Sequence, residues 1–204
     1  MSLSAQLWSD NSDLAADVLA HPFVRGMANG TLPRERFAAY IAQDAFFLES
    51  FARAYALALA RSRDTATLLA LADLIAGVRE ELGLHASYAA SWGIDTAGVQ
   101  PLAATSAYTE FLLATAATQE VGVIYAAMTP CMRLYAWLGQ SLDADHAGPY
   151  AQWVQTYADP EFENIARRLE GLLDDQADDT PAVRDAYRRA MHLELGFFEA
   201  AMSV

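Results

Sequence analysis

The sequence predicts an all-α protein, and three observations support this fold class. Alanine and leucine are abundant while β-branched residues are few, and apolar residues recur at spacings of three and four rather than two. The breaks between apolar segments carry glycine, proline and aspartate. The first two features are typical of α-helices and the third of the loops that join them. With 204 residues, 54% of them hydrophobic, the chain can bury a substantial core, so we expect one domain spanning 1–204.

The expected helices follow one another with short loops between them. They lie near residues 4–19, 34–61, 65–91, 105–119, 120–140, 148–157, 160–173 and 181–202. Three of the starts carry a polar side chain close to a proline, at Thr31, Asp159 and Thr180. Such a side chain can cap the first backbone N–H groups, and proline suits the first turn. Several helices are apolar on more than one side, which predicts a helical bundle that forms a homo-oligomer.

Charge and composition exclude several classes of function. The formal net charge is −13 and the acidic residues are spread along the chain, which argues against nucleic acid and anionic membranes as partners. No apolar run reaches the roughly 18 to 20 residues of a membrane span, and residues 1–21 lack the pattern of a signal peptide. A single cysteine excludes an internal disulfide and a cysteine-rich zinc site. We therefore expect a cytoplasmic protein. Its acidic surface is compatible with small neutral or cationic ligands, although solubility alone is the more frequent reason for such a charge.

Three expected helices each carry one reactive polar residue on an otherwise apolar face. Asp44 interrupts the apolar stripe of 34–61, Cys131 that of 120–140, and Glu194 that of 181–202. A buried carboxylate needs hydrogen-bond partners or an altered protonation state, and both are common at active sites. Each residue alone is more simply explained as a satisfied core residue or an inert thiol. The repetition on three helices indicates a shared site.

Pro130 lies directly before the only cysteine and leaves two structures open. A proline inside a helix removes a backbone hydrogen bond and kinks the helix. If the helix instead restarted here, Cys131 would lie near a helix N-terminus, where the dipole favours the thiolate. Tyr108, Tyr135 and Tyr157 lie on apolar faces and can line one cavity with the two carboxylates. Such a cavity suits a flat heteroaromatic ligand with ring nitrogens and amino groups, although aromatic stripes are more often plain core.

A metal site has weak support in the sequence. Glu81 and His85 lie one turn apart, and Glu49 or His192 from other helices would complete a set of the kind found in helical di-iron proteins. Four histidines are few for such a site, so no metal is expected. The sequence also contains no glycine-rich phosphate loop, no G-x-S-x-G elbow and no H-E-x-x-H motif.

Five segments together resemble a known family. They are "YIAQDAFFLESFARAYA" around Asp44, "YTEFLLATA" from Tyr108, "AAMTPCMRLYAWLG" around Cys131, "WVQTYADPEFE" around Tyr157 and "ELGFFEAA" from Glu194. In this order they resemble the TenA family, or thiaminase II, over nearly the whole chain. The resemblance implies a haem-oxygenase-like all-α fold, a homotetramer, and hydrolysis of aminopyrimidines derived from thiamin without metal or organic cofactor.

The resemblance also implies roles for individual residues. Cys131 would be the nucleophile that adds to an electron-poor pyrimidine carbon, and Glu194 the acid and base that protonates the leaving amine and activates water. Asp44 would hydrogen-bond the ring nitrogen and amino group. The wall of the substrate site would be formed by Phe47, Tyr108, Tyr135, Tyr157 and Phe197.

One departure from the family pattern concerns Phe47. Many members carry tyrosine three residues after the aspartate, so a hydroxyl near the ring is lost here. The leading hypothesis is conversion of 4-amino-5-aminomethyl-2-methylpyrimidine to the hydroxymethylpyrimidine in thiamin salvage, with thiamin as a further substrate. A protein that binds a pyrimidine without converting it, or a metal-dependent oxidase of the same fold, are the alternatives.

Overall fold

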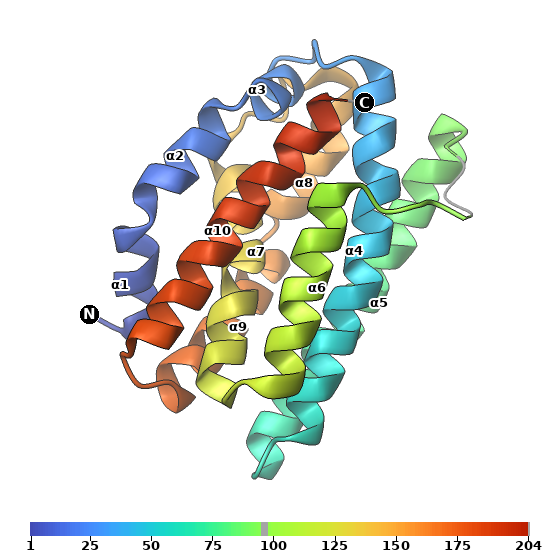
Figure 1. Cartoon of the computed structure of the whole chain (residues 1–204). Coiled ribbons are helices and arrows are strands. Elements are labelled where there is room, and N and C mark those ends of the chain that lie inside the picture. The colour runs from blue at the N-terminus through green and yellow to red at the C-terminus, as the bar shows by residue number, and fades with distance from the viewer. Residues whose placement is uncertain (95–97, 204) are drawn as a thin grey trace.

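A computed structural model describes residues 1–94 and 98–203, and every regular element within them is helical (Figure 1). The elements are α1 (Leu3–Asp10), α2 (Ser12–Ala20), α3 (Pro22–Ala28), α4 (Arg34–Ala60), α5 (Thr65–Trp92), α6 (Ala103–Thr118), α7 (Val121–Ser141), the 3-10 turn η1 (Gly148–Tyr150), α8 (Ala151–Ala158), α9 (Pro160–Gln176) and α10 (Pro181–Met202). The all-α prediction is confirmed.

The long helices pack side by side around α7. Helices α10, α6, α4 and α5 follow one another across the front of Figure 1, and α7, α8 and α9 lie behind them. Helix α7 packs most extensively on α10, α9 and α8, and it also touches α6 and α4. Buried apolar side chains from all of these helices form one cluster. A residue on the inner face of α7 is therefore surrounded by side chains from several other helices.

The expected helix 4–19 is wrong, because the chain breaks at Asn11. The Asn11 backbone N–H bonds back to the end of α1, and its side-chain Nδ2 donates to the Leu7 carbonyl at 2.8 Å. Its Oδ1 accepts from Arg188 on α10 at 3.1 Å. An asparagine side chain that bonds the local backbone competes with helix continuation. The contact with α10 then fixes the break in the folded structure.

The short helix α3 was not expected from the sequence. Pro22 occupies its first turn, and the His21 ring accepts a hydrogen bond from the Phe23 backbone N–H at 3.2 Å. Of the three expected capping residues, Asp159 and Thr180 do cap α9 and α10. Thr31 does not cap α4, because its hydroxyl bonds Asn29 and the helix starts after a proline without a side-chain cap. The expected helix 148–157 consists of the 3-10 turn followed by α8.

Helix α7 continues through Pro130, which settles the alternatives that the proline left open. The Thr129 hydroxyl donates to the Tyr125 carbonyl at 2.7 Å inside this helix. Cys131 therefore lies in the middle of a helix and receives no stabilisation from a helix N-terminus. Further along, Gly139 lets α8 approach closely, since a Cβ atom there would overlap the backbone of Tyr157. The absence of a side chain at Gly139 thus allows Tyr157 to pack directly against α7.

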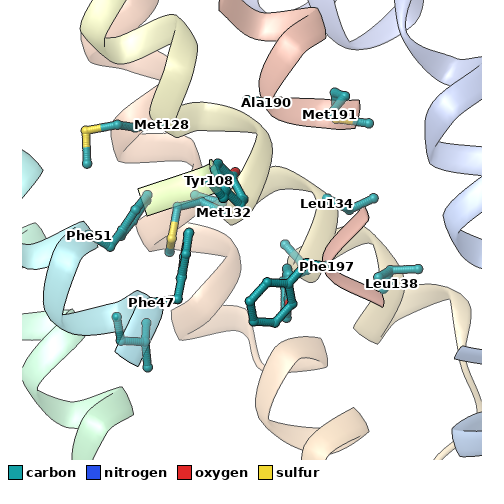
Figure 2. Close-up of a cluster of buried hydrophobic side chains, with 14 of the residues drawn as sticks. Phe47, Phe51, Tyr108, Met128, Met132, Leu134, Leu138, Ala190, Met191 and Phe197 are labelled. Carbon is teal, nitrogen blue, oxygen red and sulfur yellow. The ribbon is translucent and has the colours of Figure 1, made fainter. Parts of the chain in front are cut away.

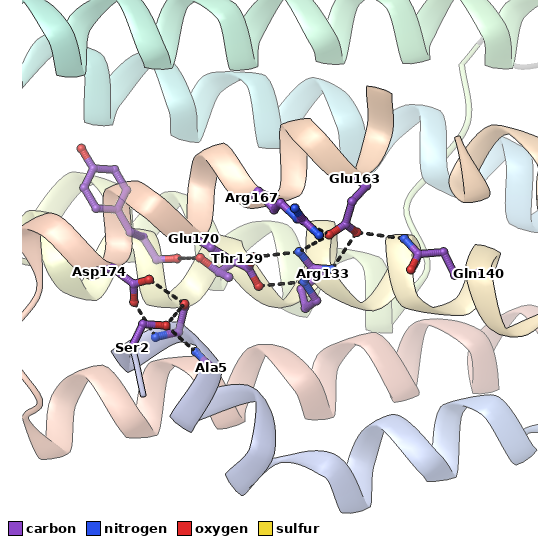
Figure 3. Close-up of polar contacts among 11 residues, drawn as sticks. Ser2, Ala5, Thr129, Arg133, Gln140, Glu163, Arg167, Glu170 and Asp174 are labelled. Atoms are coloured by element: carbon purple, nitrogen blue, oxygen red, sulfur yellow. Dashed lines mark hydrogen bonds and ion pairs between the residues drawn. The ribbon is translucent and has the colours of Figure 1, made fainter. Parts of the chain in front are cut away.

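An ion-pair network joins α7 to α9 (Figure 3). Arg133 donates to Glu170 through two nitrogens at 2.7 Å each and to Glu163 at 2.8 and 3.3 Å. Glu163 also accepts from Gln140 and Arg167. Paired, largely buried charges of this kind are costly to break singly. The network therefore fixes the position of the helix that carries Cys131.

Among the described residues, no helix is both long enough and apolar enough to cross a membrane.

Candidate active site

Glu194 on α10 is the best-connected of the three polar residues expected to form a site. Its side chain is 2% exposed, and its Oε1 accepts a hydrogen bond from the Tyr108 hydroxyl on α6 at 2.6 Å. Burial raises the pKa of Glu194 from 4.5 to about 7, while hydrogen bonds from Tyr108 and Cys131 lower it in part. At neutral pH the carboxyl group therefore exchanges readily between its protonated and ionised forms, as an acid and base must.

Cys131 on α7 is half-buried and lies within hydrogen-bonding reach of Glu194. Burial raises the pKa of its thiol well above 9.0, and the negative charges of Glu194, Glu81 and Asp44 raise it further. The resting group is therefore a neutral thiol. Because only the thiolate is strongly nucleophilic, a nearby base must take its proton. Glu194 is in position to do so.

Asp44 on α4 is buried close to His85 on α5. The distance from Asp44 Oδ2 to His85 Nε2 is 3.2 Å. Burial raises the pKa of Asp44 well above 3.8, as do the charges of Glu81 and Glu194, whereas a hydrogen bond from Tyr40 lowers it. Burial lowers the pKa of His85 to about 4, so the imidazole is neutral. Burial thus favours the protonated form of the Asp44 carboxyl group, and its Oδ2 makes no well-aligned hydrogen bond within the protein.

Tyr135 and Tyr157 form one side of the site, with ring centroids 4.9 Å apart. The Tyr40 hydroxyl donates to the Tyr135 hydroxyl at 3.1 Å, and the Trp153 ring nitrogen donates to Tyr40 at 3.3 Å. The Tyr157 hydroxyl donates to Glu81 at 2.7 Å. Both tyrosines that the sequence placed in this wall are therefore buried, and each is held by a hydrogen bond from or to another helix.

Phe47 on α4 belongs to the buried hydrophobic cluster that contains Tyr108 and Phe197 (Figure 2). Its ring centroid is 4.7 Å from that of Tyr108 and 5.9 Å from that of Phe197 on α10, and the Phe51 ring stacks behind it at 5.5 Å. All of these rings are buried. The two phenylalanines expected to face a substrate thus lie together, next to the tyrosine that bonds Glu194.

Glu81 on α5 is a further acidic group at the site, which the sequence analysis considered only as a metal ligand. Burial raises its pKa from 4.5 to about 7, and its hydrogen bond from Tyr157 lowers it in part. Its charge acts on the pKa of both Asp44 and Cys131. The signal in the sequence was its position one turn before His85, because that spacing puts both side chains on the face of α5 that meets α4.

The di-iron ligand set considered from the sequence is not assembled. Glu49 lies on the surface and pairs with Arg53 at 3.1 Å, and His192 is exposed. In the part of the chain that the structure describes, no group of three or more histidine, cysteine or acidic side chains is arranged to hold a metal ion.

The chemistry available is that of a neutral thiol beside a carboxyl group with a pKa near neutrality. Asp44, a carboxyl group whose pKa is raised by burial and whose Oδ2 lacks a well-aligned hydrogen bond, is close enough for its charge to act on the thiol. This combination suits nucleophilic addition to a ring that offers a basic nitrogen and an amino group.

Comparison with known proteins identifies relatives of the whole chain. Residues 8–203 match the model of the TENA/THI-4/PQQC family. The bifunctional TH2 protein of Arabidopsis thaliana is 34% identical over 98% of this chain, although the chain spans only 37% of that protein. An aminopyrimidine aminohydrolase of Halalkalibacterium halodurans is 31% identical over 87% of this chain and 83% of its own length.

Solved structures confirm the expected fold. A TenA family transcription regulator from a Silicibacter species superposes with a TM-score of 0.92 at 27% identity, covering 98% of this chain and 96% of its own. A Shewanella denitrificans domain of unknown function with a heme oxygenase-like fold superposes with a TM-score of 0.73 at 15% identity, over 98% of this chain and 91% of its own. Sequence and structure therefore agree that this chain belongs to the TENA/THI-4/PQQC family.

Proposed function

We propose that the protein is an aminopyrimidine aminohydrolase of thiamin salvage. It hydrolyses 4-amino-5-aminomethyl-2-methylpyrimidine to the hydroxymethylpyrimidine and ammonia, and it also accepts thiamin. The observation that carries the proposal is the Cys131 thiol beside Glu194, whose pKa burial raises to about 7, with the buried Asp44 close enough for its charge to act on the thiol. Relatives named aminopyrimidine aminohydrolase, from Halalkalibacterium halodurans and Helicobacter pylori, support the substrate class.

Asp44 binds the pyrimidine by a pair of hydrogen bonds. A protonated carboxyl group offers one O–H donor and one carbonyl acceptor. The ring nitrogen of the substrate accepts from the donor, and the adjacent amino group donates to the carbonyl oxygen. This contact uses the free hydrogen-bonding capacity of the Asp44 carboxyl group and holds the ring against Phe47 and Tyr108.

In the first half of the reaction the amine leaves. Glu194 takes the thiol proton, and the sulfur of Cys131 forms a bond to an unsubstituted ring carbon. The displaced electron pair moves through the ring to the nitrogen that faces Asp44, which receives the Asp44 proton. The pair then returns through the ring and breaks the exocyclic CH2–N bond. The amine leaves with the proton held by Glu194, and an exocyclic methylene remains on a cationic ring beside the Asp44 carboxylate.

In the second half water replaces the amine. The water oxygen bonds to the methylene carbon, and Glu194 takes the released proton. The ring nitrogen returns its proton to Asp44, and the electron pair expels the sulfur, which takes the proton from Glu194. The thiol, both carboxyl groups and the aromatic ring are then as they began, so the cycle needs no further reactant.

Product chromatography tests this function. Purified protein and the Cys131→Ala and Glu194→Gln variants are incubated with the aminomethylpyrimidine and, separately, with thiamin. Hydroxymethylpyrimidine should form with the parent, and each variant should lose at least about 1000-fold in rate, since the nucleophile or its base is missing. The exposed Glu199→Gln on the same helix is the matched control and should retain full activity. Full activity of Cys131→Ala would eliminate the covalent route.

A non-catalytic pyrimidine-binding protein is the second candidate, favoured by the missing hydroxyl at Phe47. Thermal stabilisation by the aminomethylpyrimidine without any product would support it. We also propose that the protein is a homotetramer in the cytoplasm that needs no cofactor. Light scattering coupled to gel filtration tests the assembly, and a mass near that of one chain would overturn it.

A further inference from the structure

A cavity of about 260 Å³ lies between α5, α8 and α9 and adjoins the candidate active site at Glu81. Three residues lie at its inner end: Tyr55 on α4, Glu81 on α5 and Met132, which follows Cys131 on α7. Its outer end carries the exposed carboxylates Glu80, Asp159 and Glu161. The cavity therefore runs from exposed residues to Glu81, whose charge acts on the Cys131 thiol.

The walls of this cavity combine apolar surface with negative charge. The apolar lining consists of Leu74, Val78, Leu84, Phe162 and Ile165. Four carboxyl groups line the cavity, and none of the described residues around it is a lysine, arginine or histidine. Apolar walls with uncompensated acidic groups favour a ligand that is itself apolar in body and positively charged.

Tyr55 gives an independent indication that a ligand belongs here. Its side chain is fully buried, yet its hydroxyl has no hydrogen-bond partner. The hydroxyl lies near the thiol and the acidic group at the inner end, since the charges of Cys131 and Glu81 both raise its pKa. A buried polar group left without a hydrogen-bond partner destabilises the fold, and a ligand in the cavity would remove that cost.

We propose that this cavity binds the departing half of the substrate, a compact apolar group carrying a positively charged nitrogen. Glu81 faces the cation, and the Tyr55 hydroxyl hydrogen-bonds the same group. Ammonia is far smaller than the cavity, so the space fits a ring-sized leaving group. Glu81 also holds Tyr157 at 2.7 Å, which links the occupied cavity to the wall of the pyrimidine site. The inference rests on the proposed function, because it takes the pyrimidine to lie beside Cys131.

A kinetic comparison of two substrates with the same pyrimidine tests the inference. The aminomethylpyrimidine releases ammonia, whereas thiamin releases a thiazole that is cationic in the substrate. Tyr55→Phe should lower kcat/KM for thiamin by about ten-fold or more and for the aminomethylpyrimidine by less than about three-fold. Glu81→Gln also loses its bond to Tyr157, so it should lower both rates, but the loss for thiamin should be about ten-fold greater than that for the aminomethylpyrimidine. Glu49→Gln, on the surface of α4, and Tyr125→Phe, another buried hydroxyl without a partner, are the matched controls. Equal losses on both substrates would overturn the proposal.

A binding measurement makes the inference independent of turnover. Calorimetry with 3,4-dimethylthiazolium and the neutral 4-methylthiazole compares a cation with an uncharged ring of similar shape. The parent should bind the cation more tightly, and Glu81→Gln should remove this preference. If both rings bind alike to the parent, the cavity is no cation site, even where the hydrolysis works. If the cation binds through Glu81 but neither pyrimidine is hydrolysed, the proposed function fails and the cation site stands. Thermal melts check that each variant is folded. If Glu81→Gln does not fold, the comparison is made with Tyr55→Phe instead.

Discussion

The substitution Tyr108→Phe tests how Glu194 is controlled, because it removes one hydrogen bond and little else. The Tyr108 hydroxyl donates to Glu194 at 2.6 Å, and this contact favours the ionised carboxylate. The phenyl ring of the variant can keep its packing on Phe47, whose centroid is 4.7 Å away. Without the hydroxyl, the pKa of Glu194 must rise above its present value of about 7.

The size of the change follows from the charge on the acceptor. A hydrogen bond to an ionised group is worth about 1.5 to 3 kcal/mol, and 1.36 kcal/mol corresponds to one pH unit. The acid limb of the kcat/KM profile should therefore move upward by roughly 1 to 2 pH units. At pH 7, where about half of Glu194 is ionised in the parent, the rate should fall about 5- to 50-fold, since Glu194 must be ionised to take the thiol proton.

The assay is the pH dependence of kcat/KM for the aminomethylpyrimidine between pH 5.5 and 9.5, with the parent and Tyr108→Phe side by side. The variant should recover much of its rate at the alkaline end, where Glu194 is ionised again. Tyr125→Phe serves as the control, because its hydroxyl is buried without a partner. A loss of rate that is equal at every pH would refute the reasoning and place the Tyr108 hydroxyl on the substrate instead.

Three further predictions concern stability and rate. The pKa of Glu194 is about 7 in the folded protein against 4.5 ordinarily, so the folded state holds this proton more tightly than the unfolded chain. The free energy of unfolding should therefore fall by about 3 kcal/mol as the pH rises from 4.5 past 7. Urea denaturation at pH 5 and pH 8 should show a smaller fall for Glu194→Gln than for the parent. Gly139→Ala should destabilise the protein by roughly 1 to 3 kcal/mol and lower activity, because the added methyl group displaces α8. The control is Gly171→Ala, where nothing lies within 4 Å, and this variant should not be destabilised. Unchanged melting of Gly139→Ala would contradict this. Phe47→Tyr should raise kcat/KM for the aminomethylpyrimidine several-fold, since a hydroxyl worth about 1 kcal/mol is added beside the ring; an unchanged rate would show that no such hydrogen bond forms.

The helical periodicity of the sequence predicted much of the site geometry. Asp44 and Glu194 each interrupt an apolar stripe, and a residue on such a stripe points toward neighbouring helices. Both are indeed buried, and Cys131 lies within reach of Glu194. This prediction needed only the spacing of residues along each helix. The catalytic roles remain predictions, as do the single domain, the homotetramer and the cytoplasmic location.

The interruptions of the helices could not be predicted in the same way. Asn11 ends α1 partly because its side chain accepts from Arg188, which is 177 residues away in the chain. Similarly, Pro130 allowed either a restart or a continuous helix, and packing of α7 on α9 and α10 favours continuity. Such choices depend on contacts that form only in the folded protein, so local sequence preference leaves them undecided.

The protonation states of the thiol and the acidic groups depend on distances between helices. They could not be predicted from the sequence for that reason. The sequence analysis allowed a thiolate at Cys131, but the surrounding acidic groups and burial raise the pKa of the thiol. It also grouped Glu81 and His85 as metal ligands, whereas Glu81 bonds Tyr157 and His85 faces Asp44. The sequence correctly predicted that Glu81 and His85 share one face of their helix. Their partners on α8 and α4 decide what they do.

Burying three acidic groups around one thiol is expensive, and this cost argues for function. Raising the pKa of a carboxyl group from 4.5 to about 7 costs about 3 kcal/mol of stability at alkaline pH, and Glu81 and Glu194 each carry such a shift. A core that served packing alone would be more stable with apolar residues at these positions. In the proposed function these carboxyl groups bind the substrate. The ring nitrogen and the amino group would form hydrogen bonds with a carboxyl group, and the positive charge would pair with another.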